Sequence, residues 1–418
     1  MSGDFTPDQK RYLEGFVSGL STARVARGAG GGGKVEPTGP DAIHIKAQDR
    51  TIAAGGKLAD QEKFKHELHP FDAYPKLREQ AEKNEPPKPA DNFRWRYFGL
   101  FYVAPAQDSY MLRLRIPCGI LSAHQLRGVA RLAEDCGGGY SHVTTRANLQ
   151  VREIQAKDAE RVLIALAGLG LTSRGSGADN IRNITGDPTA GISAQELIDV
   201  RPLCEEMHHY ILNHRELYGL PRKFNIAFDG GGPISSVQDT NDIGFAAVRV
   251  AEGRAVPAGV YFRLHLGGIT GHGDFARDCG ILVRPEECAD VAAAVIRVFI
   301  AHGDRTNRQK ARMKYVIDQH GLEWYLAETE KELGRALPRL ASEACEPRPP
   351  EQRGAHIGFH AQKQADRYYV GVVLPAGRMT SAQMRGLADI AEHHGSGTLR
   401  LTVWQNLLVS DIAEHDIA

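Results

Sequence analysis

This sequence of 418 residues lacks closely spaced cysteines, long apolar runs and an excess of charge of either sign. Its apolar runs fall well short of the roughly 20 residues that a membrane-spanning helix needs, so we expect no membrane segment. Lysine plus arginine and aspartate plus glutamate both number 51, so no overall charge attracts nucleic acid or an anionic membrane. Any basic site must therefore be local.

The six cysteines are scattered, and the closest two, Cys279 and Cys288, are nine positions apart. A cubane iron-sulfur cluster needs four thiolates that close spacing brings together. The spacing predicts instead reduced, buried thiols and no metal ligand within this chain.

The N-terminus predicts a helix, because Thr6 can cap it, Pro7 suits its first position and Gln9 can complete a capping box. It has neither the charged start nor the apolar segment of a secretory signal, so we expect a cytoplasmic protein. The glycine run at 28–33 and the proline- and lysine-rich stretch at 85–89 predict an irregular arm that wraps the body.

An internal repeat is the most informative feature of the sequence. Residues 117–151 align without a gap with residues 375–409, at a constant offset of 258, and about 14 of roughly 35 positions are identical. Chance would give only a few identities. The chain therefore contains two copies of one structural unit.

In each copy, the sequence pattern predicts a strand, a helix and a second strand. The first strands alternate at 111–116 and 369–374, and each helix starts with a capping box, Ser122 with Gln125 and Thr380 with Gln383. Glycines end both helices. The second strands alternate at 142–151 and 400–409, so each copy predicts parallel strands joined by a crossover helix, and the two copies could form one pseudo-symmetric sheet.

Three arginines distinguish the two copies. Alternation sends residues i and i+2 to one face, so Arg113 and Arg115 should project together, away from the helix, and Arg146 should do so on the second strand. The second copy has largely apolar residues at the matching positions, namely Gly371, Val373 and Trp404. This indicates that the face is covered in both copies. Because a covered, unpaired charge is costly, the arginines predict an anionic ligand, with ordinary ion pairs or surface exposure as the alternative.

Several segments resemble the siroheme-dependent nitrite and sulfite reductases, and most closely the ferredoxin-dependent assimilatory nitrite reductases. These segments are 111–117 (MLRLRIP), 144–150 (TTRANLQ), 179–183 (DNIRN) with 186–188 (GDP), 220–225 (LPRKFN), 307–310 (NRQK) and 362–364 (QKQ). The likeness runs from about residue 95 to 410. It implies an α+β fold in which two ferredoxin-like half domains, each a βαβ repeat, surround a central mixed α/β domain that binds siroheme beside a 4Fe-4S cluster.

The expected organisation has four parts. They are an N-terminal helix and wrapping arm at 1–95, a first half domain at 96–160, a middle domain at 161–345 and a second half domain at 346–418. Within the middle domain we expect helices near 202–217 and 289–302 and strands at 224–228, 245–250 and 261–266.

The resemblance also implies roles for individual residues. Four match the surroundings of the substrate anion: Arg113, Arg182, Lys223 and Asn225. Fifteen match cofactor-binding positions: Arg115, Thr144, Thr145, Arg146, Asn148, Gln150, Arg222, Asn307, Arg308, Lys310, Arg312, Gln362, Lys363, Gln405 and Asn406. The cations would hold the substrate and stabilise charged intermediates, and arginines suit the carboxylates of the macrocycle because they pair with two oxygens at once. The redox chemistry would belong to the cofactor.

Asn225 separates the two branches of the family. Sulfite reductases resemble Arg-Lys-Phe-Lys at 222–225, with a further cation for the more highly charged sulfite, whereas nitrite reductases resemble Arg-Lys-aromatic-Asn. Since this chain has Asn225, we expect reduction of nitrite to ammonia in nitrate assimilation, with reduction of sulfite to sulfide as the alternative. The expected partners are nitrite and ferredoxin or another low-potential electron donor, without nucleic acid or membrane, and the expected state is a monomer.

The sequence departs from complete family members in one respect. They continue into a second α/β domain whose two close cysteine pairs hold the cluster, one thiolate also ligating the siroheme iron, and this sequence reaches Ala418 without such pairs. We therefore expect the cluster ligands in a segment outside this chain, weak siroheme binding at most, and no turnover by these residues alone.

Other motifs have weaker interpretations. The run at 28–34 resembles a phosphate-binding loop, but Val35 replaces the required Ser or Thr. His208, His209 and His214 share a predicted helix without an acidic or cysteine partner at metal spacing, so packing or surface roles are expected. The basic run at 305–314 predicts a solvated helix face or a carboxylate-binding edge. A non-catalytic ferredoxin-like binding module and a precorrin-oxidising enzyme are the remaining alternatives.

Overall fold

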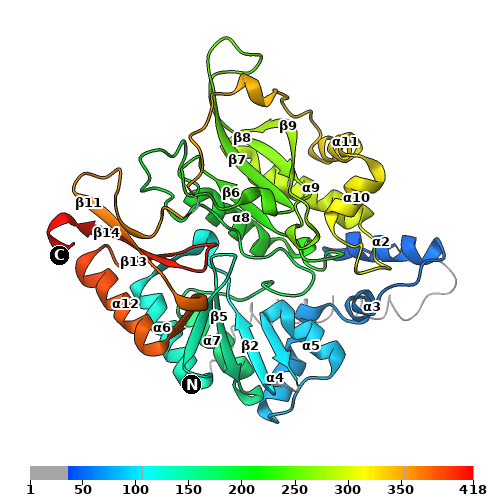
Figure 1. Ribbon diagram of the computed structural model, residues 1–418. Helices are drawn as coiled ribbons and strands as arrows, with labels where there is room; N and C mark the ends of the chain where they lie inside the picture. Colours follow the sequence, from blue (N-terminus) through cyan, green and yellow to red (C-terminus); the bar gives the residue numbers. More distant parts are fainter. Residues whose placement is uncertain (1–35, 105–106, 353, 418) are drawn as a thin grey trace, which may run out of the picture. The chain divides into compact units, whose positions relative to one another are not determined.

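The computed structural model describes residues 36–104, 107–352 and 354–417, and the chain divides into two units after Gly39. All helices and strands of the described residues lie in the unit that begins at Pro40 (Figure 1). The predicted helix start at Thr6 and the glycine run at 28–33 lie outside the described residues.

Residues 42–98 are mostly helical, and within them the proline- and lysine-rich stretch is irregular at 85–88, as predicted. Four α-helices form there: α2 (Ala42–Ala53), α3 (Asp60–Glu67), α4 (Tyr74–Glu82) and α5 (Pro89–Trp95). Prolines occupy the first turns of α4 and α5, where the missing N–H costs nothing because it would have no partner inside the helix. Of the prolines in the 85–89 stretch, Pro86 and Pro87 lie in irregular chain and Pro89 begins α5.

The two copies of the repeat form two five-stranded sheets, which corrects the expected single sheet. The first has the order β1 (Leu100–Val103), β2 (Ser109–Arg113), β5 (Leu149–Ile154), β4 (Tyr140–Val143) and β12 (Arg378–Thr380). The second has the order β10 (Gly358–Ala361), β11 (Arg367–Val372), β14 (Leu407–Ala413), β13 (Thr398–Leu401) and β3 (Ile120–Ser122). Each sheet thus receives its last strand from the other copy, β12 beside β4 and β3 beside β13.

Two glycines allow this exchange of strands. Gly119 and Gly377 occupy the same position in the two copies and have φ angles of +71° and +67°. A Cβ atom on Gly119 would lie 2.6 Å from the carbonyl oxygen of Leu401, and one on Gly377 would lie 2.7 Å from that of Val143. A side chain at either position would separate the two copies, which accounts for a glycine in both.

The strands predicted at 142–151 and 400–409 are each two strands joined by a tight turn. The N–H of Thr144 donates to the carbonyl of Asn148 at 2.8 Å, and Ala147 has a φ of +46°. In the second copy Gln405 has a φ of +60°. The turn reverses the chain, so β5 runs antiparallel to β2 and β4, and the predicted parallel pairing is wrong.

The helices of the repeat confirm the prediction closely. They are α6 (Ala123–Cys136) and α12 (Ser381–His394), and both predicted capping boxes are present. The two helices lie side by side (Figure 1). Reciprocal ion pairs, Arg127 with Glu392 at 2.5 Å and Arg385 with Glu134 at 2.6 Å, link them across the pseudo-twofold relation. Because these pairs are exposed, the apolar contacts between the helices carry most of the stability.

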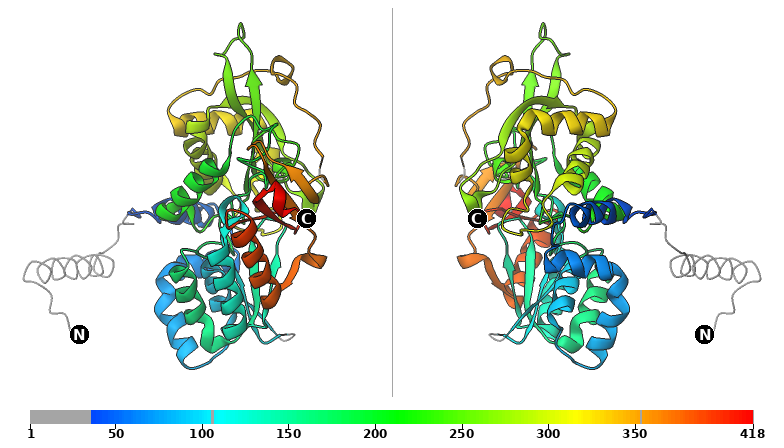
Figure 2. Two further views of the ribbon diagram at one scale, coloured as in Figure 1. Left: turned by 90° about the vertical axis from the view of Figure 1, so that its left-hand side faces the viewer. Right: turned by 90° about the vertical axis from the view of Figure 1, so that its right-hand side faces the viewer.

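The middle domain contains a four-stranded sheet with the order β6 (Ile226–Asp229), β7 (Ile243–Val250), β8 (Gly259–Leu266) and β9 (Arg277–Val283). Its helices are α8 (Arg201–Asn213), α9 (Cys288–His302), α10 (Met313–His320) and α11 (Leu322–Leu333), with α8 and α9 packed beside the sheet (Figure 2). The three predicted strands and two predicted helices of this region are confirmed within a few residues. An α+β fold of two related units and a mixed middle domain results, as predicted.

An irregular segment joins the first half domain to the middle domain. Ile181 pairs with Phe224 and Thr185 with Ala227 as parallel bridges, so the segment 181–185 runs alongside the start of β6. The short helix α7 (Ala159–Gly168) precedes it. This pairing brings Arg182 next to the residues that lead into β6, where the predicted site lies.

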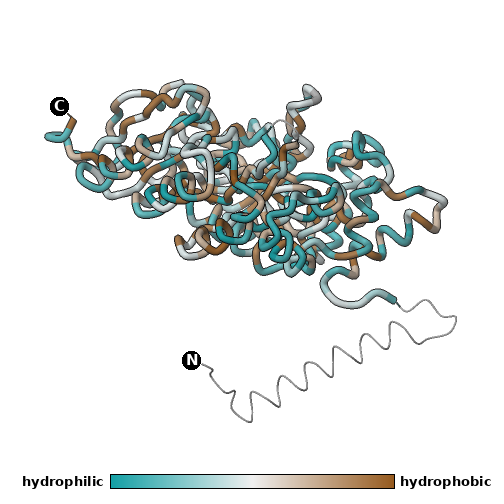
Figure 3. The backbone as a smooth tube through the Cα atoms, turned by 90° about the horizontal axis from the view of Figure 1, so that it is seen from below, coloured by the Kyte–Doolittle hydropathy of each residue, from teal (hydrophilic) through white to brown (hydrophobic). Residues whose placement is uncertain are grey.

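Two large apolar clusters form the core, one within the half domains and one within the middle domain. Hydrophobic and hydrophilic stretches are interspersed along the described part of the chain (Figure 3). No helix among the described residues is long and apolar enough to cross a membrane.

Candidate anion- and cofactor-binding site

A cavity of about 740 Å³ lies where the turn at 144–148, the segment 181–185 and the residues before β6 meet. The equivalent turn of the second copy contributes its residues 403–405 to the same wall. Ten of the predicted residues line it: Arg113, Thr144, Thr145, Arg146, Asn148, Gln150, Arg182, Lys223, Asn225 and Gln405. The two copies of the repeat thus present equivalent turns to one cavity.

A second cavity of about 470 Å³ adjoins the first and shares Lys223 and Asn225 with it. Its wall adds three more of the predicted residues: Arg222, Arg308 and Arg312. Most of the predicted site is therefore assembled in one place, although its residues come from segments far apart in the sequence.

Four cations in the first cavity, Arg113, Arg146, Arg182 and Lys223, have no carboxylate partner within the described part of the chain. The guanidinium of Arg113 lies 4.5 Å from the centre of the Phe101 ring, and that of Arg182 donates to the carbonyls of Ser176 and Ala178. Lys223 forms neither a hydrogen bond nor an ion pair among these residues. Positive charge is concentrated here without internal neutralisation.

Burial and mutual repulsion lower the pKa values of these cations. Burial, followed by the charges of Arg312 and Arg182, lowers the pKa of the Lys223 ammonium to about 8. Burial also lowers the pKa of Arg113 to about 10 and that of Arg182 well below its usual value. An anion bound between them would relieve both effects, because it supplies the missing countercharge.

Arg146 is held by neutral oxygens. Its guanidinium donates to the carbonyls of Asn183 and Ile226 and to the side-chain oxygen of Asn241, at 2.7 to 3.2 Å. Burial lowers the pKa of Arg146 to about 9. Carbonyls orient the guanidinium without cancelling its charge, so Arg146 adds to the positive field of the cavity.

The basic run at 305–314 does not form the helix face that was one of the two predictions, and the carboxylate-binding edge stays a prediction. Residues 303–312 are not helical, and three of the arginines form ion pairs inside the protein: Arg305 with Glu62, Arg308 with Asp179 and Arg312 with Asp242, each at 2.7 Å. Arg308 and Arg312 line the second cavity but are already neutralised. Asn307 and Lys310 are exposed and line neither cavity.

Four further predicted cofactor residues lie away from both cavities. Arg115 is 1% exposed and donates to the carbonyl of Ile181 at 2.6 Å, because β2 ends at Arg113 and the alternation stops there. Lys363 pairs with Glu196 at 2.7 Å. Gln362 and Asn406 bond to residues of their own half domain, Gln362 to Asp411 and Asn406 to His356 and the N–H of Leu374.

Prediction from the sequence missed six residues that line the first cavity: Asn183, Val237, Thr240, Thr270, Val403 and Trp404. Trp404 occupies the repeat position of Arg146 in the second copy, so the alignment of the copies contained a signal for it. The indole N–H of Trp404 and the side-chain oxygen of Asn225 are buried and have no hydrogen-bond partner within the described residues. Both residues line the first cavity, so it has two unpartnered polar atoms in its wall.

The predicted histidines and cysteines have packing roles. His208 is buried beside Arg115, and burial lowers its pKa to about 3. His214 stacks on Tyr210 with ring centres 3.9 Å apart. Five cysteines are buried, Cys345 is half-buried and all six are unpaired. Within the described residues, no group of three or more His, Cys, Asp or Glu is arranged to hold a metal ion.

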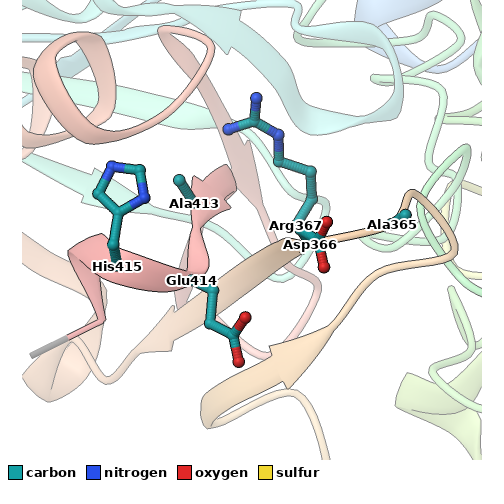
Figure 4. Close-up of a pocket in the computed structure, with 6 residues that line it drawn as sticks. All are labelled: Ala365, Asp366, Arg367, Ala413, Glu414 and His415. Carbon is teal, nitrogen blue, oxygen red and sulfur yellow. The ribbon is translucent and has the colours of Figure 1, made fainter.

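A separate hollow lies at residues 365–367 and 413–415, and Figure 4 shows its side chains. It shares no lining residue with either cavity, and its polar residues Asp366, Arg367, Glu414 and His415 are exposed. No predicted site residue contributes to it.

Comparison with known proteins gives two family models that match the chain. The nitrite and sulphite reductase 4Fe-4S domain matches residues 177–337, and the nitrite/sulfite reductase ferredoxin-like half domain matches residues 104–169 and 360–418. Together the two models cover both copies of the repeat and the middle domain between them.

Individual relatives agree with these models. The chain is 38% identical over 325 residues to a ferredoxin-nitrite reductase of Leptolyngbya laminosa, covering 74% of this chain and 60% of that one. It is 34% identical to a ferredoxin-nitrite reductase of Synechococcus elongatus, covering 78% and 63%. The solved NirA protein of Mycobacterium tuberculosis superposes with a TM-score of 0.79 at 25% identity, covering 87% of this chain and 68% of that one. The chain spans about three fifths of the length of these curated relatives, and it belongs to the nitrite and sulfite reductase family.

Proposed function

We propose that this chain forms the siroheme- and substrate-binding part of a ferredoxin-dependent assimilatory nitrite reductase, which reduces nitrite to ammonia. One observation carries the proposal: Arg113, Arg182 and Lys223 line a single cavity without a carboxylate partner in the described part of the chain. Such a cluster is costly unless an anion enters it. A small anion between the three cations, beside a larger polyanion, fits this arrangement.

The residues present fit siroheme, whose carboxylates need many donors. Arg146, Gln150 and Arg222 supply charge and amide hydrogen, and the unpartnered indole N–H of Trp404 supplies a further donor. Arg308 and Arg312 would contribute less than expected, since each already pairs with an aspartate. When bound, siroheme together with the 4Fe-4S cluster would transfer electrons from the external donor to the substrate.

The residues of the chain itself would bind the substrate and donate a proton to it. Arg113 and Arg182 remain charged at neutral pH and would orient the nitrite oxygens. The Nζ of Lys223 has a pKa of about 8, so it is protonated at neutral pH yet releases its proton more readily than an ordinary lysine. A proton can therefore pass from Nζ to a substrate oxygen as negative charge develops there.

Asn225 supports nitrite as the substrate rather than sulfite. Its side chain is neutral, and its buried oxygen has no partner within the described residues. A neutral amide suits a singly charged anion, whereas a more highly charged anion would gain from a further cation. Reduction of sulfite to sulfide is the alternative that the experiment must exclude.

The proposal extends to the surroundings of the reaction. Ferredoxin, which the names of the relatives contain, would be the electron donor. The cluster ligands would come from outside this chain, as the cysteine spacing predicts. A monomeric, cytoplasmic protein with half domains at 96–160 and 346–418 around a middle domain at 161–345 completes the proposal.

A siroheme titration tests the proposal directly. We expect a saturable change in siroheme absorbance on adding the chain, and a further change with nitrite at lower concentration than with sulfite. Arg182→Ala and Lys223→Ala should each weaken the binding of nitrite to the siroheme-loaded chain by roughly tenfold, as loss of one charge-assisted contact does. Arg127→Ala, on the exposed face of α6, is the matched control and should bind like the wild type. Absence of saturable binding, or equal loss in the control, would refute the proposal.

A further inference from the structure

Asn183 lines the first cavity and forms hydrogen bonds to two separate segments of the chain around it. Its side chain is 2% exposed and lies between the first half domain and the middle domain. The side-chain oxygen accepts the N–H of Ile116 at 2.8 Å, and the side-chain nitrogen donates to the carbonyls of Ile116 at 2.6 Å and Arg146 at 3.0 Å. One amide group thus joins the chain that follows β2 to the turn that carries Arg146.

The backbone of Asn183 holds the other end of Arg146. Its carbonyl oxygen accepts hydrogen bonds from the Nε and Nη2 atoms of the Arg146 guanidinium, at 3.2 and 2.7 Å. Asn183 therefore contacts Arg146 twice, at its main chain through the side-chain amide and at its charged end through the carbonyl. These contacts fix both the turn and the direction of the guanidinium.

The position of Asn183 in the fold explains why one residue can do this. The preceding residue, Arg182, is a cavity cation whose N–H donates to the carbonyl of Phe224 at 2.8 Å. The segment is thus already fixed against the middle domain, and the amide of Asn183 ties the half domain to that fixed point. The task needs an acceptor and a donor on one short side chain, which asparagine supplies and aspartate or alanine does not.

We propose that Asn183 is a positioning residue that aims the Arg146 guanidinium into the cavity, where it meets an acidic group of the bound tetrapyrrole. The inference rests on the proposed function, because it assumes that siroheme occupies this cavity. Asn183 does not touch the reacting atoms and acts through Arg146. Its effect on binding must therefore depend on Arg146 being present.

A purely structural role is the competing explanation, and Asn180 provides the control for it. Asn180 is 0% exposed, lies three residues earlier in the same segment and also clamps backbone: its side chain donates to the carbonyl of Gly177 at 2.9 Å and accepts the N–H of Gly219 at 3.1 Å. It lines neither cavity. A loss that comes only from weakened packing would appear in both asparagine variants.

The test is a double-mutant cycle read by siroheme absorbance on the purified chain. We expect Asn183→Ala and Arg146→Ala each to weaken siroheme binding by roughly tenfold. The double variant should bind no more weakly than Arg146→Ala alone, because without the guanidinium nothing is left to aim. Asn180→Ala should stay within about twofold of the wild type. Hydrogen exchange of the ligand-free chain should show faster exchange at 144–148 in Asn183→Ala and not in Asn180→Ala.

The outcomes separate the two proposals. If the wild-type chain does not bind siroheme saturably, the proposed function fails and this inference fails with it. If the wild type binds but the two losses multiply in the double variant, or Asn180→Ala loses as much, only the positioning role is overturned. Should Asn183→Ala not fold, Asn183→Asp, which keeps the acceptor and removes the donor, takes its place in the cycle. Failure of both variants to fold would assign Asn183 to folding and overturn the proposal.

Discussion

Replacing Lys223 by methionine should stabilise the chain at neutral pH. The ammonium lies among Arg182, Arg222 and Arg312, and burial with these charges lowers its pKa from 10.5 to about 8. Methionine has a similar length and no charge, so it removes the repulsion and keeps most of the packing. The cavity thus has a cost in stability that serves binding.

The size of the effect follows from the pKa. At about 1.4 kcal/mol for each pH unit, the shift from 10.5 to about 8 sets an upper limit of about 3 kcal/mol. Because the side chain is only partly buried, solvent screening reduces this to about 1 to 2 kcal/mol. The native state binds the proton less tightly than the unfolded chain, so the penalty is complete below pH 8. It disappears as the pH rises from about 8 to 10.5.

Urea unfolding of the wild type and Lys223→Met at pH 7 and pH 10 measures this difference. The variant should have the higher free energy of unfolding at pH 7, and most of this difference should be lost at pH 10. Lys223→Arg keeps the charge at both pH values and should show no such convergence. A variant that is less stable than the wild type at pH 7, or a difference independent of pH, would refute the reasoning.

Three further predictions follow from single contacts. Asn225→Lys should raise the affinity for sulfite relative to nitrite by roughly tenfold in competition titrations of the siroheme-loaded chain, because it adds a cation to the cavity; an unchanged ratio would count against the assignment of Asn225. Asp179→Asn should lower the free energy of unfolding by about 3 kcal/mol or more, since it removes a fully buried carboxylate that pairs with two cations. Gly371→Ala should prevent folding or cost more than about 3 kcal/mol, because its Cβ would lie 1.6 Å from the carbonyl oxygen of His356, whereas Gly386→Ala in α12 has open space and should gain about 0.5 to 1 kcal/mol. Thermal or urea unfolding checks both glycine variants, and equal behaviour of the two would contradict the structure.

The helices of the repeat were predictable, because the sequence signals that specify each helix lie within a few residues of one another. The capping boxes at Ser122 and Thr380 specify where α6 and α12 begin, and apolar spacing specifies their buried faces. The antiparallel hairpin was not predictable, because Ala147 and Gln405 adopt the positive φ that usually identifies a turn through glycine or asparagine. The exchange of β3 and β12, three residues each, leaves no periodic pattern in the sequence.

The cations of the site were predictable from the sequence, but the residues that pair with those cations were not. Resemblance of short motifs brought Arg113, Arg182 and Lys223 together, and the cavity agrees. Arg308 was expected to be available to a ligand, but its partner Asp179 lies 129 positions away and only the tertiary structure brings the two into contact. Asn183 belongs to the segment 179–183 that resembles the family, but no role was assigned to it, because an amide that bonds to backbone has no signature in a single sequence.

The reciprocal strand exchange affects how the chain folds during translation and what happens when it is cut between the two copies. During translation the first sheet remains open along β4 until the middle domain and much of the second copy have left the ribosome, because β12 arrives only then. Pairing across such a separation is slow, since a long loop must close before any contact forms. A protein cut between the copies would have an unprotected edge on each piece, open to aggregation with other chains. The same edges would allow separately expressed halves to associate by strand pairing.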